Sequence, residues 1–204
     1  MSKDKARFST RVILFICRKI LFRVKLHNEE VLDEYDSYLI CPNHGRVFDP
    51  AFVFPKKYDR DVHIIAKKEL FRHAWFRWLA KRYNIISIDR DNVDVRSMLE
   101  SLKVFKEDDK AKLLLFPEGK VIKNPEDIGK VYKKGAAFIA SHLDKPIIPV
   151  YITRRPKLFQ RVNVYYGKPY TITKEDAKGI GKMDSLSKDL LERIYSMRVL
   201  EEKK

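Results

Sequence analysis

His44 and Asp49 are the residues whose types and spacing first suggest chemistry. They lie in CPNHGRVFDP (residues 41–50), where four residues separate the imidazole from the carboxylate. Histidine titrates near neutral pH and can accept a proton from a reacting hydroxyl. A nearby carboxylate can fix the histidine tautomer and stabilise the imidazolium that forms, as in a catalytic triad. The competing interpretation is a surface turn that happens to hold a histidine, because short motifs have a high false-positive rate.

A second candidate site lies in LLLFPEGK (residues 113–120), where an apolar run ends in Pro-Glu-Gly. Glu118 followed by Gly119 indicates a turn that contacts a substrate, because glycine lets the backbone approach a ligand closely. The competing interpretation is an ordinary polar turn that leaves a strand.

Two further segments carry cations that suit an anionic group. Arg90 in SIDRDN (87–92) offers a planar fork for phosphate or carboxylate, although three neighbouring aspartates are alternative partners. Lys134 precedes Gly-Ala-Ala in YKKGAAFIA (132–140), where a helix N-terminus would favour an anion. The small residues equally fit a helix face packed closely on a sheet.

Short apolar runs alternate with longer helical patterns after residue 36, which predicts an α/β domain with a mostly parallel sheet flanked by helices. KLLLF and PIIPVYI are continuous runs, as in strands covered on both faces. The predicted strands are 38–41, 62–66, 85–88, 112–116 and 147–152, with an alternating edge strand over 161–167. The predicted helices are 69–82, 93–107 and 134–143, with a last helix capped by Asp184 or Ser185. His44 then follows a strand at its carboxyl end, where α/β sheets place ligand crevices.

Residues 11–25, RVILFICRKILFRVK, have a basic amphipathic pattern. Wound as a helix, the segment gathers cations on one side and apolar residues on the other, as in helices that lie in a membrane interface. The alternative is a terminal helix packed on the core. The longest apolar run is too short to span a bilayer, and no small-residue cleavage site follows. We therefore expect residues 1–35 to be a membrane-associating helical segment and residues 36–204 to be the remaining domain.

The composition describes a basic globular chain. Of 204 residues 45% are hydrophobic, which argues against disorder, and the net charge of +15 favours anionic partners such as lipid, nucleic acid or an acidic carrier protein. Cys17 and Cys41 have no metal-ligand spacing and fit small apolar residues in a reducing compartment.

Four blocks in order, N-H-x-x-x-x-D, I-D-R, F-P-E-G and the proline of PIIPV, resemble the glycerolipid acyltransferase family, and within it the bacterial 1-acyl-sn-glycerol-3-phosphate acyltransferases. The resemblance runs from about residue 36 to 170. It implies that His44 is the general base and that Asp49 orients it. Arg90 falls on the arginine associated with the glycerol phosphate, Glu118 and Gly119 on the acceptor-binding turn, and Pro149 on the fourth block.

The chain departs from the family pattern at two places. Lys120 and Val121 follow F-P-E-G, where the family commonly has Thr-Arg, and Asn84 replaces a frequent glycine ahead of the second block. These departures bear on how a phosphate is bound and therefore on the acceptor.

The implied reaction is the transfer of a fatty acyl group from a thioester to the hydroxyl of lysophosphatidic acid, which gives phosphatidic acid. No local serine or cysteine completes a triad, so the acceptor hydroxyl attacks directly. Backbone N–H groups of the His44 loop or of the Pro-Glu-Gly turn are candidates to stabilise the oxyanion. No cofactor is expected beyond an acyl-carrier-protein or coenzyme A thioester as donor. No metal is expected, because the other histidines have no H-E-x-x-H-like arrangement.

The expected contacts fall into two sets. Besides His44 and Asp49, the residues expected to contact substrates are Asn43, Arg90, Glu118, Gly119, Lys120, Lys134 and Pro149. The residues expected to contact an anionic membrane are Arg11, Arg18, Phe22, Arg23, Trp75 and Trp78. The two tryptophans stand among cations in KKELFRHAWFRWLAKR, although a helix with its aromatic residues in the core has the same pattern.

We therefore expect a peripheral protein on the cytoplasmic face of the cell membrane. One alternative is an acyltransferase for another lysolipid or for glycerol 3-phosphate. Another is a basic membrane- or nucleic-acid-binding protein, which explains the charge but not the ordered blocks, and no nucleic-acid-binding motif is present. An α/β hydrolase is disfavoured because G-x-S-x-G is absent.

Overall fold

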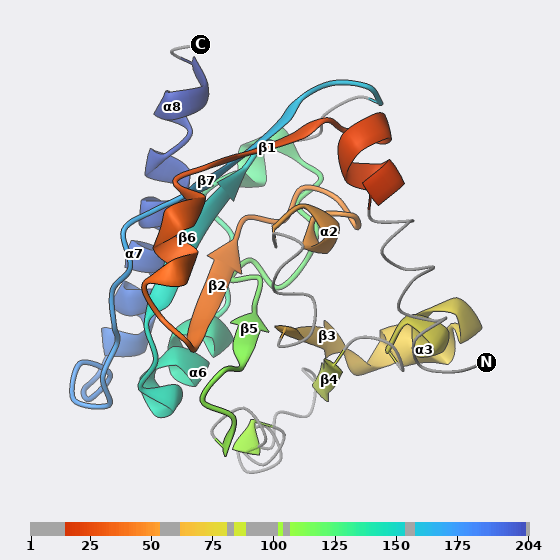
Figure 1. Ribbon diagram of the computed structural model, residues 1–204. Coiled ribbons are helices and arrows are strands. Elements are labelled where there is room, and N and C mark those ends of the chain that lie inside the picture. Colours follow the sequence, from red (N-terminus) through yellow and green to blue (C-terminus); the bar gives the residue numbers. More distant parts are fainter. Residues whose placement is uncertain are drawn as a thin grey trace.

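The computed structural model describes residues 15–53, 62–80, 84–88, 102–103, 107–153 and 158–202. These residues form a seven-stranded sheet in the order β1-β7-β6-β2-β5-β3-β4 (Figure 1). The strands are β1 (Val24–His27), β2 (Tyr38–Pro42), β3 (Val62–Lys67), β4 (Asn84–Ile88), β5 (Lys112–Leu114), β6 (Ile147–Ile152) and β7 (Val162–Tyr166). Strands β2 to β6 are mutually parallel, and β1 and β7 run the opposite way. The predicted α/β class with a mostly parallel sheet is confirmed.

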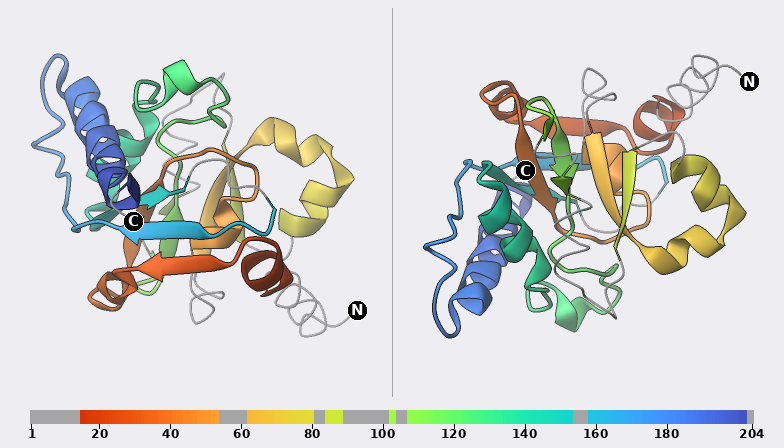
Figure 2. Two further views of the ribbon diagram at one scale, coloured as in Figure 1. Left: turned by 90° about the horizontal axis from the view of Figure 1, so that it is seen from above. Right: turned by 90° about the horizontal axis from the view of Figure 1, so that it is seen from below.

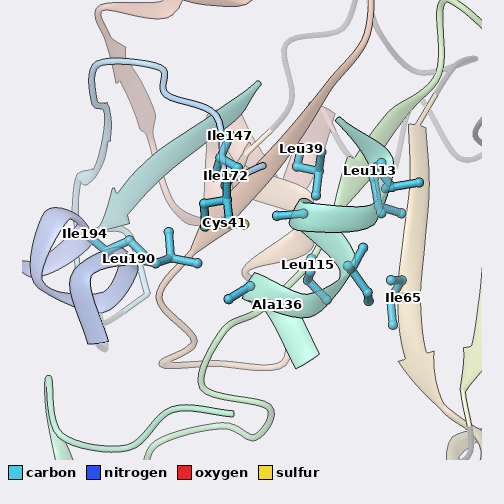
Figure 3. Packing of buried hydrophobic residues seen from close by; sticks show 14 of the residues in the cluster. Leu39, Cys41, Ile65, Leu113, Leu115, Ala136, Ile147, Ile172, Leu190 and Ile194 are labelled. Carbon is cyan, nitrogen blue, oxygen red and sulfur yellow. The ribbon is translucent and has the colours of Figure 1, made fainter. Parts of the chain in front are cut away.

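The continuous apolar runs become the central strands because helices cover the sheet on both faces. Every residue of β2 and β6 is buried. On one face, α6 (Gly135–Leu143) and α7 (Lys182–Ser196) pack on a core that includes Leu39, Leu113 and Ile147 (Figure 3). The views in Figure 2 place these two helices together on one side of the sheet.

The opposite face is covered by short helical segments. These are the π-helix η1 (Ile16–Leu21), the 3-10 helix η2 (Glu29–Asp33) and α2 (Pro50–Val53). Their apolar residues join even-numbered residues of β6 in a second core, which includes Phe22 and Phe52 with ring centroids 5.0 Å apart.

Helix α6 begins where the sequence predicts it. Its small residues Ala136, Ala137 and Ala140 are buried, so the helix approaches the sheet closely. The small-residue interpretation of this segment is therefore confirmed.

The N-terminal segment differs from the prediction. The helix expected over residues 11–25 ends at Leu21, and Val24–His27 instead forms β1, which pairs in parallel with β7. The turn between them passes through Arg23 with a φ of 37°, a left-handed conformation that a continuing helix excludes. The expectation that 161–167 is an edge strand is wrong for the same reason, because β7 lies between β1 and β6. A short amphipathic segment can satisfy its backbone groups in a sheet as well as in a helix, and here the sheet prevails.

The other helical elements are η4 (Lys68–Arg72), α3 (Ala74–Ala80), η5 (Pro125–Asp127) and α8 (Val199–Glu202). The helix predicted over 69–82 is divided at His73, whose backbone is extended. The last helix begins at Lys182 after Gly181, so neither Asp184 nor Ser185 caps it. The helix predicted over 93–107 lies almost wholly outside the described residues.

Candidate active site

The carboxyl ends of three central strands meet at the candidate site. His44 comes two residues after β2, Glu118 lies four residues beyond β5, and Ile152 ends β6. These strands are neighbours, since β2 pairs with β5 on one side and with β6 on the other. The sheet therefore brings together residues that are 74 and 109 positions apart in the chain.

Asn43 fixes the start of the His44 loop. Its Nδ2 donates to the carbonyl of Ile152 at 3.0 Å, and its Oδ1 accepts the N–H of Ile152 at 2.7 Å. The side-chain amide thus continues the pairing of β2 with β6 beyond the last backbone bond. Asn43 is only 1% exposed and positions the loop; its contact with a substrate stays a prediction.

His44 and Asp49 form the pair that their spacing predicts. Nδ1 of His44 lies 3.1 Å from Oδ2 of Asp49. The same oxygen accepts the backbone N–H groups of Gly45 at 2.7 Å and of Arg46 at 2.8 Å. A carboxylate only accepts hydrogen bonds, so Nδ1 of His44 carries the proton and Nε2 is left with a free lone pair. That lone pair is what a general base requires.

The surroundings of the pair keep the imidazole in place. The His44 ring stacks on Phe116 with a centroid distance of 3.9 Å. The His44 side chain is 16% exposed and the Asp49 side chain 4%. The carboxylate is therefore shielded while the imidazole remains accessible at the protein surface.

Glu118 does not lie open to a substrate as expected. It is fully buried; its Oε2 accepts the backbone N–H of His44 at 2.6 Å, and its Oε1 accepts the hydroxyl of Tyr195 at 2.5 Å. The carboxylate thus binds the His44 loop, and its direct contact with a substrate stays a prediction. Gly119 then turns the chain with a φ of 69°, which favours glycine.

The other residues expected to contact substrate are either exposed lysines or a proline buried in the sheet. Lys120 is exposed with Nζ 4.0 Å from Asp127, and Lys134 is exposed with Nζ 3.4 Å from Asp184. Pro149 is buried in the middle of β6, where its carbonyl accepts the N–H of Gly167. The contact of Pro149 with a substrate stays a prediction.

The backbone N–H groups of the site divide into two sets. Those of His44, Gly45 and Arg46 already donate to Glu118 and Asp49, so these three are excluded as oxyanion donors. The segment after Glu118 runs beside His44, since the N–H of Ile122 donates to the His44 carbonyl at 2.8 Å. Within the described residues no acceptor is found for the N–H groups of Lys120 and Val121.

The cations expected at the site are only partly described. Arg90 and Arg11 lie outside the described residues, as do the side chains of Trp75 and Trp78. Arg46, two residues beyond His44, is half-buried, and its Nε is buried without a hydrogen-bond partner in the part of the chain that the structure describes. Among the residues expected at a membrane, Arg18 and Arg23 are at the surface, but Phe22 is 4% exposed and packs on Phe52. The membrane contact of Phe22 stays a prediction.

Tyr195, Phe116 and Arg46 join the site without having been expected. Phe116 belongs to the same strand end as Glu118, so the F-P-E-G block pointed to its neighbourhood. Tyr195 lies 77 residues from Glu118, and its helical surroundings in the sequence contain no sign of a contact with a loop near β5.

Neither a membrane-spanning helix nor a metal-binding cluster is found among the described residues. No helix among them has the length and apolarity needed to cross a membrane. No group of three or more His, Cys, Asp or Glu side chains within these ranges is arranged to hold a metal ion.

Comparison with known proteins gives concordant results. The chain is 28% identical over 153 residues to the 1-acyl-sn-glycerol-3-phosphate acyltransferase of Streptococcus pneumoniae, covering 72% of this chain and 55% of the relative. It is 29% identical over 126 residues to the protein of that name from Bacillus subtilis, covering 62% and 60%. An uncharacterized acyltransferase of Schizosaccharomyces pombe is 25% identical over 154 residues, covering 75% and 55%. The matches thus span less than two thirds of each relative's length.

A protein-family model named Acyltransferase matches residues 23–153, a range that holds His44, Asp49 and Glu118. This range is more than half of the chain and includes the strand ends that form the site. The chain belongs to the acyltransferase family.

Proposed function

We propose that this acyltransferase moves a fatty acyl group from a thioester to the free hydroxyl of lysophosphatidic acid, giving phosphatidic acid. The observation that carries the proposal is the His44–Asp49 pair at the carboxyl end of β2, with Nε2 of His44 left to accept a proton. The names of the two bacterial relatives support this choice of acceptor. Acyl-carrier-protein and coenzyme A thioesters are the two donor classes that fit.

The proposed reaction needs one base and one set of oxyanion donors. Nε2 of His44 takes the proton of the acceptor hydroxyl as its oxygen attacks the thioester carbonyl carbon. The carbon–sulfur bond then breaks, and the leaving thiolate takes the proton from the imidazolium, which Asp49 has stabilised meanwhile. The N–H groups of Lys120 and Val121 are the proposed donors to the oxyanion, because they lie between the two hydrogen bonds that join residues 118 and 122 to His44.

The acceptor phosphate requires fixed cations. Arg90, Lys120 and Lys134 remain proposed contacts, and Arg46 joins them because its Nε is buried without a partner in the described part of the chain. A guanidinium binds phosphate oxygens in a bidentate way. Another lysolipid or glycerol 3-phosphate is the alternative acceptor.

A lipid surface is the proposed partner of the exposed apolar residues around His44. Val47 and Phe48 in the His44 loop are 66% and 57% exposed, and Phe159 in the loop before β7 is 60% exposed. The N–H of Phe159 donates to Leu21 in η1, whose residue Ile20 is also exposed. We call Ile20, Val47, Phe48 and Phe159 the apolar rim.

Cations accompany the apolar rim. Nε of Arg23 donates to the carbonyl of Phe159 at 2.9 Å, and Arg18 and Lys19 belong to η1. Apolar side chains among cations suit the interface of an anionic membrane. We propose peripheral attachment at the cytoplasmic face, with Arg11, Trp75 and Trp78 as further contacts.

Attachment is tested by flotation with anionic vesicles. The double variant Phe48→Ser/Phe159→Ser should bind less than the wild type, while Ile180→Ser, in the loop before α7 and fully exposed, should bind as the wild type does. Binding should weaken with salt and persist in part, because apolar burial is not screened. Equal flotation of all three proteins would contradict the role of the apolar rim, and salt-matched retention on nucleic acid instead of vesicles would favour the non-enzyme alternative.

The reaction is tested with a panel of acceptors and donors. Lysophosphatidic acid, other lysolipids and glycerol 3-phosphate are each mixed with an acyl-carrier-protein or coenzyme A thioester, and acylated products are identified by mass spectrometry. Phosphatidic acid should be the main product. Acylation of another acceptor alone would replace the proposed substrate, and the absence of any product from the folded protein would contradict the enzymatic function.

A further inference from the structure

The buried carboxylate of Glu118 joins three separate parts of the fold. Its two oxygens accept the N–H of His44, in the loop after β2, and the hydroxyl of Tyr195, near the end of α7. Glu118 itself lies in the turn beyond β5 and is fully buried. One side chain thus connects the loop of the proposed base to a helix on the α6–α7 face of the sheet.

The segment that carries Glu118 holds the backbone of His44 on both sides. Oε2 of Glu118 accepts the His44 N–H at 2.6 Å, and the N–H of Ile122 donates to the His44 carbonyl at 2.8 Å. The direction of the imidazole depends on this backbone as well as on Asp49. A rotation of the Glu118 carboxylate would therefore remove one of the bonds that fix His44.

Tyr195 is held firmly enough to set the direction of that carboxylate. Its ring packs on Gly129, which has a φ of 70°. A Cβ added to Gly129 would stand 3.6 Å from two ring carbons of Tyr195. On another side, the ring meets Tyr151 edge-on with centroids 6.0 Å apart. The hydroxyl is thus delivered to Oε1 of Glu118 by a packed ring on a 15-residue helix.

We propose that Tyr195 is a positioning residue of the active site. Its hydroxyl fixes Glu118 as the acceptor of the His44 N–H, and so keeps Nε2 of His44 aimed at the acceptor hydroxyl. A buried carboxylate is held by the donors that meet its oxygens, so loss of the Tyr195 hydroxyl removes one of the hydrogen bonds that set the direction of Glu118. The catalytic part of this inference rests on the function proposed above.

Tyr195→Phe is the direct test, because it keeps the packed ring and removes the hydroxyl. The expected result is a fall in kcat of about 10- to 100-fold, the scale of effect that misplacement of a catalytic group produces. KM for donor and acceptor should change by less than about 2-fold, since Tyr195 touches neither substrate in this account. Tyr165→Phe is the control, because it removes a hydroxyl that donates to Leu200 on the same C-terminal segment, and its kcat should match the wild type.

A second readout does not depend on turnover. In the NMR spectrum, the amide proton of His44 should lie far downfield because it donates to a carboxylate at 2.6 Å. Tyr195→Phe should shift this resonance and speed its hydrogen exchange, whereas Tyr165→Phe should leave both unchanged. If the wild type acylates no acceptor, the proposed function fails, and this readout alone still decides whether Tyr195 positions the His44 loop.

Glu118→Gln is the second variant if Tyr195→Phe does not fold. It keeps the shape of the side chain but replaces one of the two accepting oxygens with an NH₂ group, so kcat should fall and the His44 amide resonance should move. A Tyr195→Phe protein, or a Glu118→Gln protein in its place, with kcat within about 2-fold of the wild type and an unmoved His44 amide resonance would overturn the proposal.

Discussion

The imidazole of His44 and the carboxylate of Asp49 are joined through one oxygen that also organises the loop between them. Oδ2 of Asp49 accepts Nδ1–H of His44 and the backbone N–H groups of Gly45 and Arg46. The carboxylate thus closes the turn and orients the base at once, which explains why the spacing of the two residues matters. Any change of Asp49 therefore affects both the loop and the base.

Asp49→Asn should lower kcat by about 10²- to 10⁴-fold, the range attributed to general base catalysis. The amide lacks the charge that stabilises the imidazolium, and its NH₂ group cannot accept Nδ1–H. Steady-state kinetics together with circular dichroism would separate this effect from unfolding. A folded Asp49→Asn protein with wild-type kcat would show that the carboxylate serves only the turn.

Gly119→Ala should destabilise the fold by about 1–2 kcal/mol, the cost of a left-handed conformation for a residue with a Cβ. Gly119 has a φ of 69° and follows Glu118, so the same change should also lower activity. Gly135→Ala is the matched control, because Gly135 opens α6 and, among the described residues beyond its chain neighbours and the backbone of its own helix, no atom lies within 4 Å of the added Cβ. Thermal unfolding measures the stability of the two variants. Equal melting temperatures for the two variants would contradict the requirement for glycine at 119.

Arg46→Ala should raise KM for lysophosphatidic acid about 10-fold, which corresponds to about 1.4 kcal/mol of binding free energy. Arg46→Lys should recover only part of this, because an ammonium lacks the bidentate geometry of a guanidinium. Lys188→Ala removes an equal charge from an exposed position of α7 and should leave KM unchanged. If an acceptor without phosphate shows the same loss, Arg46 does not bind the phosphate.

Cys41 should resist alkylation in the native protein at pH 8. Complete burial raises the pKa of its thiol, so almost no thiolate forms below that pKa. Mass spectrometry of the labelled protein should find Cys41 modified only after unfolding, with activity retained before it. Rapid native labelling of Cys41 with loss of activity would favour a covalent acyl-enzyme over direct attack by the acceptor.

The sequence predicts the parts of the fold that local patterns determine. β6 and the start of α6 come from a continuous apolar run and from a Gly-Ala-Ala start, and both appear where expected. β1 escapes prediction because its helix-like pattern is overridden by pairing with β7, about 138 residues away along the chain.

In the candidate site too, local patterns predict some features, and contacts between distant parts of the chain determine the others. The His44–Asp49 pair is local, so its spacing suggests it, and the four ordered blocks favour it over a surface turn. The roles of Asn43 and Glu118 depend on Ile152 and Tyr195, which only the folded sheet brings close. The Pro-Glu-Gly pattern therefore draws attention to the turn beyond β5, but the hydrogen bond from the His44 N–H to Glu118 is visible only in the folded sheet.

The most direct test of the account is the rate of phosphatidic acid formation by His44→Ala. The imidazole stacks on Phe116 at the edge of the core, so its loss should leave the fold intact by circular dichroism. The rate should fall by about 10³-fold relative to the wild type, while His142→Ala on α6 should retain wild-type turnover. A folded His44→Ala protein that still forms phosphatidic acid at a rate near that of the wild type would contradict the assignment of His44 as the general base.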